Sequence, residues 1–197
     1  MSLSNIQVEA LAKKMNIPLE IVCFKSELEE EDFKYNRSYI INLQDEFDSE
    51  GRRNSGSHYV CFQVNKYPNG KVEPLYFDSY GVPPPDEVPK FCGIKYIPYN
   101  IKDIQSMMNE ACGWYCLALL HYINAYHGRT QSLYEDCENF TDLFHDLNKE
   151  KDWKFNEFVL KQFFQSPDKE YRDKHPVNVY DEKDIRFIAD PNTITQS

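Results

Sequence analysis

The most apolar stretch of the chain is residues 110–123, EACGWYCLALLHYI, in a protein that is otherwise rich in polar residues. Its composition predicts a buried helix that begins near Cys112, runs to about His127 and stops at Gly128, which suits a helix C-cap. A thiol at a helix N-terminus lies at the positive end of the helix dipole, and this favours the thiolate form. Gly113 would let a substrate backbone approach this thiol closely. The alternative is a buried helix whose cysteines only pack, since free cysteine is among the most buried residue types.

Length and composition indicate a globular protein with a single domain over residues 1–197 and enough chain for a proper core. Charged residues make up 27% of the chain, aromatic residues 15%, and the formal net charge is -10. This acidic balance argues against a general phosphate-binding surface, so DNA is not an expected partner. No apolar run reaches the roughly 18 residues of a membrane span and no signal peptide is visible, so we expect no membrane attachment. The scattered cysteines then indicate reduced thiols and a cytoplasmic protein; they are residues 23, 61, 92, 112, 116 and 137.

The remaining pattern predicts an α+β fold in which a mostly antiparallel sheet packs against the buried helix. Further helices are expected at residues 1–15, 133–147 and 155–164. The first of them carries a capping box of Ser4 and Gln7 and an apolar face of Val8, Leu11, Ala12 and Met15. Strands are expected within residues 17–24, 38–43, 58–66, 71–79 and 94–97, the third and fourth joined as a hairpin by Asn69-Gly70. Loops are expected at residues 45–57 and 80–89, and residues 166–197 are expected to wrap the surface or to be mobile.

A cysteine nucleophile needs a base within reach, a group that orients the base, and donors for the oxyanion. Of the five histidines, His58 is the best candidate for the base, because it begins a predicted strand directly after a glycine-containing loop. Two others lie on the same helix as Cys112, roughly 13 and 22 Å along its axis, and cannot touch the thiol. The remaining two fall in an amphipathic segment and in the C-terminal tail, where ordinary surface or interface histidines are common.

Two further residues have candidate roles beside Cys112 and His58. Asp78 closes an apolar strand, and it either orients His58 or hydrogen-bonds within its own turn. Gln105, seven residues before Cys112, either donates to an oxyanion beside the Cys112 backbone N–H or is an ordinary solvated glutamine. Cys116, one helical turn after Cys112, is expected to pack. A metal site on these two cysteines is disfavoured, because no second Cys/His pair with zinc spacing follows.

Together these segments resemble the adenovirus-type cysteine proteases, namely adenain and its relatives in virophages and polinton-like elements, and more distantly the SUMO-specific proteases. That family has a His on a strand, an acid in a Phe-acid-x-aromatic-Gly context, a Gln, and Ala-Cys-Gly-aromatic at a helix start. The matching segments here are GSHY at 56–59, FDSYG at 77–81, Gln105, and ACGWYC at 111–116. Their order and the step from Gln105 to Cys112 match as well, and the resemblance covers roughly residues 3–125.

The resemblance implies a papain-like α+β core of the adenain type. It also implies Cys112 as nucleophile, His58 as general base and acid, Asp78 as the residue orienting His58, and Gln105 with the Cys112 N–H as oxyanion hole. No cofactor and no metal are implied. Where the family usually has Trp after the His, this chain has Tyr59. Tyrosine is also aromatic and could shield the imidazole, though less strongly than tryptophan would.

The function that the resemblance implies is a cysteine endopeptidase that cuts near small residues or glycine. It would mature capsid or core precursors of a virus or mobile element, which would place it in the host cytoplasm, the viral factory and the virion. The alternative is an isopeptidase for ubiquitin or a ubiquitin-like modifier, because those proteins end in Gly-Gly. Less favoured alternatives are an inactive binding module and an acetyltransferase with the same fold. The family includes a member that is activated by a peptide and DNA, and nothing in this sequence supports either activator.

Overall fold

The computed structural model describes residues 3–107, 109–126 and 132–164, and these form an α+β fold built on one four-stranded sheet. The strands follow the chain in the order β1 (Leu19–Phe24), β2 (Ser38–Asn42), β3 (Tyr59–Lys66) and β4 (Val72–Phe77). The pairs β2–β3 and β3–β4 are antiparallel, whereas β1 pairs with β2 in parallel. The predicted α+β class with a mostly antiparallel sheet is therefore confirmed.

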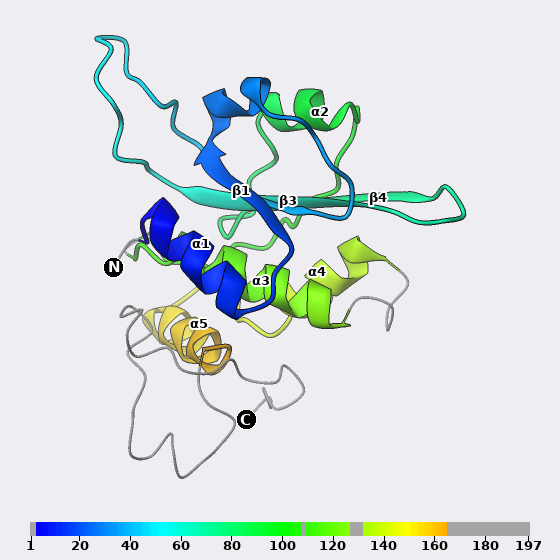
Figure 1. The fold of residues 1–197 in the computed structure, drawn as a ribbon. Coiled ribbons are helices and arrows are strands. Elements are labelled where there is room, and N and C mark those ends of the chain that lie inside the picture. Colours follow the sequence, from blue (N-terminus) through cyan, green and yellow to red (C-terminus); the bar gives the residue numbers. More distant parts are fainter. Residues whose placement is uncertain (1–2, 108, 127–131, 165–197) are drawn as a thin grey trace.

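Helices cover both faces of this sheet (Figure 1). One face carries α1 (Asn5–Lys14), α3 (Cys112–Tyr126) and α4 (Leu133–Thr141), with α5 (Glu150–Gln162) packed beyond α3. The opposite face carries the 3-10 helix η1 (Lys25–Glu30) and α2 (Glu87–Cys92). Each face has its own apolar cluster, and α3 lies at the centre of the larger one.

The first half of helix α3 is buried on all sides, as its apolar sequence predicts. Each residue from Trp114 to Leu120 is at most 1% exposed. The sheet covers one side of the helix, and α5 together with Phe164 covers another, where the Trp114 and Phe164 rings meet edge to face at 5.0 Å. The first residue of α3, Cys112, is therefore held between the sheet and the outer helices.

The local predictions hold where the signal is short-range. The capping box of Ser4 and Gln7 begins α1, and the four residues of its expected apolar face are all buried. The hairpin β3–β4 turns at Gly70, whose φ of 84° suits glycine. Residues 45–57 form a loop with a single isolated bridge between Phe47 and Arg53.

Other boundaries were wrong. Residues 94–97 do not form a strand, and the end of the expected loop at 80–89 begins the helix α2. A proline in the first turn is compatible with a helix, and Gly93, with a left-handed φ of 64°, ends it. The Ile94 N–H then bonds back to the Pro89 carbonyl. Besides its pairing with β3, β4 has one isolated bridge to this segment, between Tyr76 and Tyr99.

The two C-terminal helices also differ in extent from the prediction: α4 ends at Thr141 and α5 begins at Glu150. The expected C-cap Gly128 and the segment 166–197 lie outside the described residues. Within the described ranges, no helix combines the length and apolar character needed to cross a membrane.

Candidate active site

The sheet brings His58 and Asp78 to the same edge. His58 directly precedes β3 and Asp78 directly follows β4, and the start of one antiparallel strand lies beside the end of its neighbour. Because α3 packs on β3, its first residue, Cys112, lies at this edge too. The fold therefore gathers three residues from distant parts of the sequence.

His58 is bound to Asp78 through one ring nitrogen. The distance from His58 Nε2 to Asp78 Oδ1 is 2.8 Å, and the two side chains are 13% and 1% exposed. Burial lowers the pKa of His58, but hydrogen bonds to Asp78 and to the Cys112 side chain outweigh it and raise the pKa to about 9. At neutral pH the ring is consequently an imidazolium held by a carboxylate.

Cys112 is the first residue of α3 and is 5% exposed. Its Sγ accepts a hydrogen bond from the Tyr59 backbone N–H at 3.3 Å. The Cys112 side chain is also one of the partners that raise the pKa of His58. The sulfur therefore lies at the N-terminus of α3, beside the imidazole and within hydrogen-bond distance of a backbone N–H. A nucleophilic cysteine would need a base at this position, and the structure places His58 there.

Two buried asparagines hold the loops that carry His58 and Asp78. Asn42 Oδ1 accepts from the Ser57 backbone N–H at 3.0 Å, which fixes the residue before His58. Asn100 Oδ1 accepts from the Asp78 N–H at 3.0 Å, and Asn100 Nδ2 donates to the Asp78 carbonyl at 2.7 Å. The backbone of Asp78 is therefore held by a side chain in the way a neighbouring strand would hold it.

Gln105 lies in the same network, with every polar group of its side chain bonded. The Ser79 hydroxyl donates to Oε1 at 2.7 Å. The amide Nε2 donates to the Asn109 carbonyl at 3.0 Å and to the Tyr80 hydroxyl at 3.3 Å. Gln105 is only 1% exposed, so its amide has one fixed orientation next to the segment that leads into α3.

Helix α5 fixes the loop around Gln105 from outside. Asn156 Nδ2 donates to the Ile104 carbonyl at 3.0 Å and to the His145 carbonyl at 2.9 Å, and Asn156 Oδ1 accepts from the His145 N–H. Asn109 also bonds to Glu157 of α5 at 2.9 Å. We call Asn42, Asn100 and Asn156 the amide clamps; sequence reasoning missed all three, because their partners are distant in the chain.

Two aromatic residues differ from what the sequence suggested. The ring stacked on His58 is that of Tyr80, with a centroid distance of 4.6 Å and an interplanar angle of 23°. Tyr59, expected to shield the imidazole, directs its hydroxyl to Asn5 and packs its ring beside Gly113. The available signal for Tyr80 was its position two residues after Asp78.

Gly113 also serves a different purpose from the one expected. A Cβ atom at this position would lie 3.3 Å from Leu3 Cδ1 and 3.4 Å from Tyr59 Cδ2. Side chains of the protein, rather than a substrate backbone, therefore use the space that the missing side chain leaves. The glycine lets the N-terminal segment pack closely on the start of α3.

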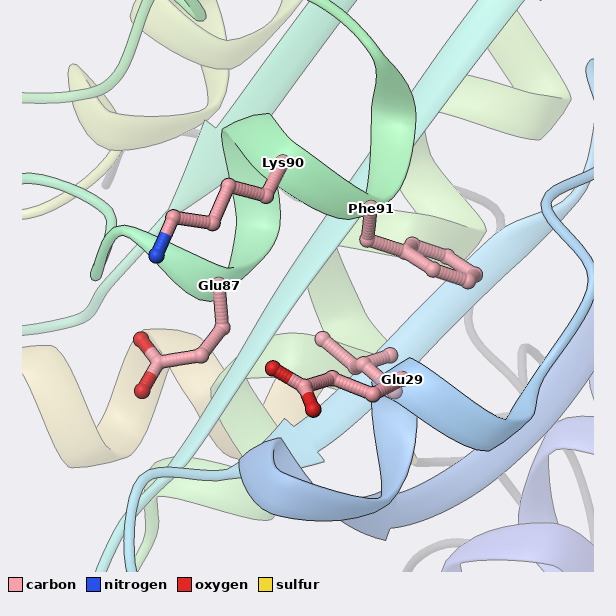
Figure 2. Close-up of a pocket in the computed structure, with 5 residues that line it drawn as sticks. Glu29, Glu87, Lys90 and Phe91 are labelled. Carbon is pink, nitrogen blue, oxygen red and sulfur yellow. The ribbon is translucent and has the colours of Figure 1, made fainter.

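Two cavities have linings that do not include His58, Asp78 or Cys112. One of about 280 Å³ lies between η1, which supplies Glu29, and α2, which supplies Glu87, Lys90 and Phe91 (Figure 2). Another of about 420 Å³ lies between residues 100–102 and α4. Within the described ranges, no group of three or more His, Cys, Asp or Glu side chains is arranged to hold a metal ion. All six cysteines are free and buried.

Replacing Gly81 by alanine is expected to destabilise the site strongly. Gly81 has a φ of 70°, and an added Cβ would lie 2.6 Å from the Ile101 carbonyl oxygen. Backbone strain and overpacking together predict a loss of about 2–5 kcal/mol in the free energy of unfolding, measured by urea denaturation. Gly70→Ala is the matched control, because Gly70 has a φ of 84° with nothing within 4 Å, and about 1–2 kcal/mol is expected. Equal losses in the two variants would contradict the prediction.

No protein-family model matches the chain, and no curated protein matches it in sequence. Solved structures with a similar fold include the following two. HopZ1a in complex with IP6 is 11% identical, with a TM-score of 0.40 over 70% of this chain and 46% of the other. The Xanthomonas campestris effector protein XopD bound to ubiquitin is 9% identical, with a TM-score of 0.41 over 70% of this chain and 90% of the other. The chain thus spans less than half the length of the HopZ1a chain. The likeness is one of fold.

Proposed function

We propose that this protein is a cysteine protease in which Cys112 is the nucleophile, His58 the general base and Asp78 the residue that orients the imidazole. One observation carries the proposal. A thiol at a helix N-terminus is bonded to an imidazole whose Nε2 lies 2.8 Å from a buried carboxylate. A base within reach of the nucleophile and a third group that orients the base are the structural signature of nucleophilic catalysis by cysteine.

The reaction is an acyl transfer in two steps. The Cys112 thiolate attacks the carbonyl carbon of the scissile bond, and the carbonyl oxygen becomes an oxyanion. The His58 imidazolium gives its proton to the leaving amine, which leaves a thioester on the enzyme. The neutral imidazole then takes a proton from a water molecule, whose oxygen attacks the thioester and restores Cys112. A general base of this kind contributes about 10²–10⁴-fold to the rate.

The narrow approach to Cys112 supports a substrate with glycine or another small residue at the cleavage point. The Cys112 residue is 5% exposed and the His58 side chain 13%, so a bulky residue has little room beside the sulfur. Maturation of precursor proteins at Gly-containing sites fits this limit. We favour this substrate because four segments of the sequence resemble the adenovirus-type cysteine proteases. Removal of a ubiquitin-type modifier through its Gly-Gly tail fits the same limit and is the alternative.

A paired assay tests the function and separates the two substrates. The full chain is incubated with a ubiquitin-type C-terminal electrophilic probe and with a Gly-x-Gly peptide library, with Cys112→Ala as control. Cleavage of peptides without probe labelling supports precursor maturation, and rapid labelling at Cys112 supports the isopeptidase. Cleavage that persists in Cys112→Ala, or no reaction with either reagent, contradicts the proposed function.

A further inference from the structure

Tyr80 is the residue that connects the separate parts of the site. Its ring stacks on His58 at 4.6 Å, and its backbone N–H donates to Asp78 Oδ1 at 2.8 Å, the same oxygen that His58 Nε2 contacts. Its hydroxyl accepts a hydrogen bond from Gln105 Nε2 at 3.3 Å. Tyr80 is half-buried. Its side chain contacts His58 and the Gln105 amide, and its backbone contacts Asp78.

The bonds of Gln105 leave its amide with no hydrogen to spare. One amide hydrogen is directed at the Asn109 carbonyl and the other at the Tyr80 hydroxyl, while Oε1 accepts from Ser79. An oxyanion bound directly by Gln105 would have to break one of these bonds inside a side chain that is 1% exposed. Breaking a buried hydrogen bond and leaving a partner unsatisfied is costly.

A phenol hydroxyl that accepts a hydrogen bond still has its own proton to donate, and accepting makes it a stronger donor. We propose that Tyr80 supplies the side-chain donor of the oxyanion hole, with Gln105 behind it as the group that orients and polarises the hydroxyl. The Cys112 backbone N–H is the second donor. This inference rests on the proposed function and assigns Gln105 a positioning role where the sequence suggested direct contact.

The electrostatics of the hydroxyl agree with this geometry. Burial, and after it the electrostatic effect of Cys112, raises the pKa of Tyr80, so the phenol keeps its proton at neutral pH. In the reaction the C–O⁻ oxygen accepts the O–H hydrogen bond, and the proton stays on Tyr80. The charge is later relieved when the carbonyl re-forms and the amine leaves, so the phenol needs no proton exchange.

The test is Tyr80→Phe, which keeps the stacked ring and removes only the hydroxyl. Acylation of Cys112 by p-nitrophenyl acetate, followed by mass spectrometry of the intact chain, is expected to slow about 10²-fold. Alkylation of Cys112 by iodoacetamide passes through no oxyanion, so its rate and pH profile are expected to match those of the unmodified protein. Tyr67→Phe is the matched control. It removes a hydroxyl that lies outside the site and donates a 2.8 Å hydrogen bond to Glu73. The acylation rate of this variant is expected to be unchanged.

A double variant tests whether Gln105 acts through Tyr80 or whether the two residues act as independent oxyanion donors. If Gln105 acts through Tyr80, Gln105→Leu combined with Tyr80→Phe slows acylation no more than the larger of the single changes. Equal or faster acylation in Tyr80→Phe, additive losses in the double variant, or a parallel loss of alkylation would each overturn the inference while leaving the proposed function standing. Absence of acylation in the unmodified protein would overturn both.

Discussion

Replacing Cys112 by alanine is expected to abolish acyl transfer, a loss on the order of 10⁶-fold, while the protein still folds. The change removes the nucleophile, and no other group in the described site can form the thioester. Its structural cost is small, because it deletes one atom and leaves the Tyr59 N–H without its 3.3 Å acceptor. We expect a loss of about 1–3 kcal/mol in the free energy of unfolding, measured by urea denaturation beside the peptidase assay.

The matched control is Cys92→Ala. Burial raises the pKa of Cys92 to about 12, so this thiol is inert at neutral pH, and its removal is expected to leave turnover unchanged. Iodoacetamide at pH 7 is expected to modify Cys112 in the unmodified protein and in Cys92→Ala. Turnover by Cys112→Ala, or preferential alkylation of Cys92, would contradict the assignment of the nucleophile.

Asp78→Asn is expected to slow peptide cleavage by about 10²–10⁴-fold. The amide can keep the bond to the Tyr80 N–H, but it removes the negative charge beside the imidazole. Burial then lowers the pKa of His58 with less to oppose it, and the ring is less often an imidazolium at neutral pH. Asp86→Asn, on an exposed residue of the following loop, is the matched control, and its activity is expected to be unchanged.

The same variant has a defined effect on the pH dependence of stability. The pKa of His58 is raised from 6.5 to about 9 in the folded protein. The resulting stabilisation is fully present below pH 6.5 and is lost as the pH rises through about 9. The difference in unfolding free energy between the unmodified protein and Asp78→Asn is therefore expected to be largest near pH 6 and to shrink toward pH 9. A difference that grows with pH would show that His58 is not the group whose pKa Asp78 raises.

The sequence predicted the parts of the fold whose signals are local. The Asn-Gly turn specifies the β3–β4 hairpin, and the apolar run after Cys112 specifies the buried helix. His58 and Asp78 flank the hairpin strands and Cys112 begins the helix that packs on β3, and their catalytic roles stay predictions. Residues 94–97 do not form the expected strand, because Gly93 ends α2 just before them and the Ile94 N–H bonds back to the Pro89 carbonyl.

The remaining features of the site depend on contacts that no local pattern encodes. The amide clamps bond to backbone groups far along the chain, such as the contact of Asn156 with Ile104. Tyr80 was part of a recognised motif, but the direction of its ring and hydroxyl follows from the packed turn around Gly81. The use of Gly113 by Leu3 likewise appears only when the N-terminal segment is placed on α3.

The amide clamps have a consequence for how this protein responds to its surroundings. Asparagine neither gains nor loses a proton in the physiological range, and its hydrogen bonds are not weakened by counterions as exposed ion pairs are. The backbones of residues 57, 78 and 104 are held by such neutral groups. Acidification or added salt should therefore change the charges of the reacting groups before it weakens the hydrogen bonds that hold the surrounding backbone. A titration of this site would then report its chemistry without a contribution from local melting.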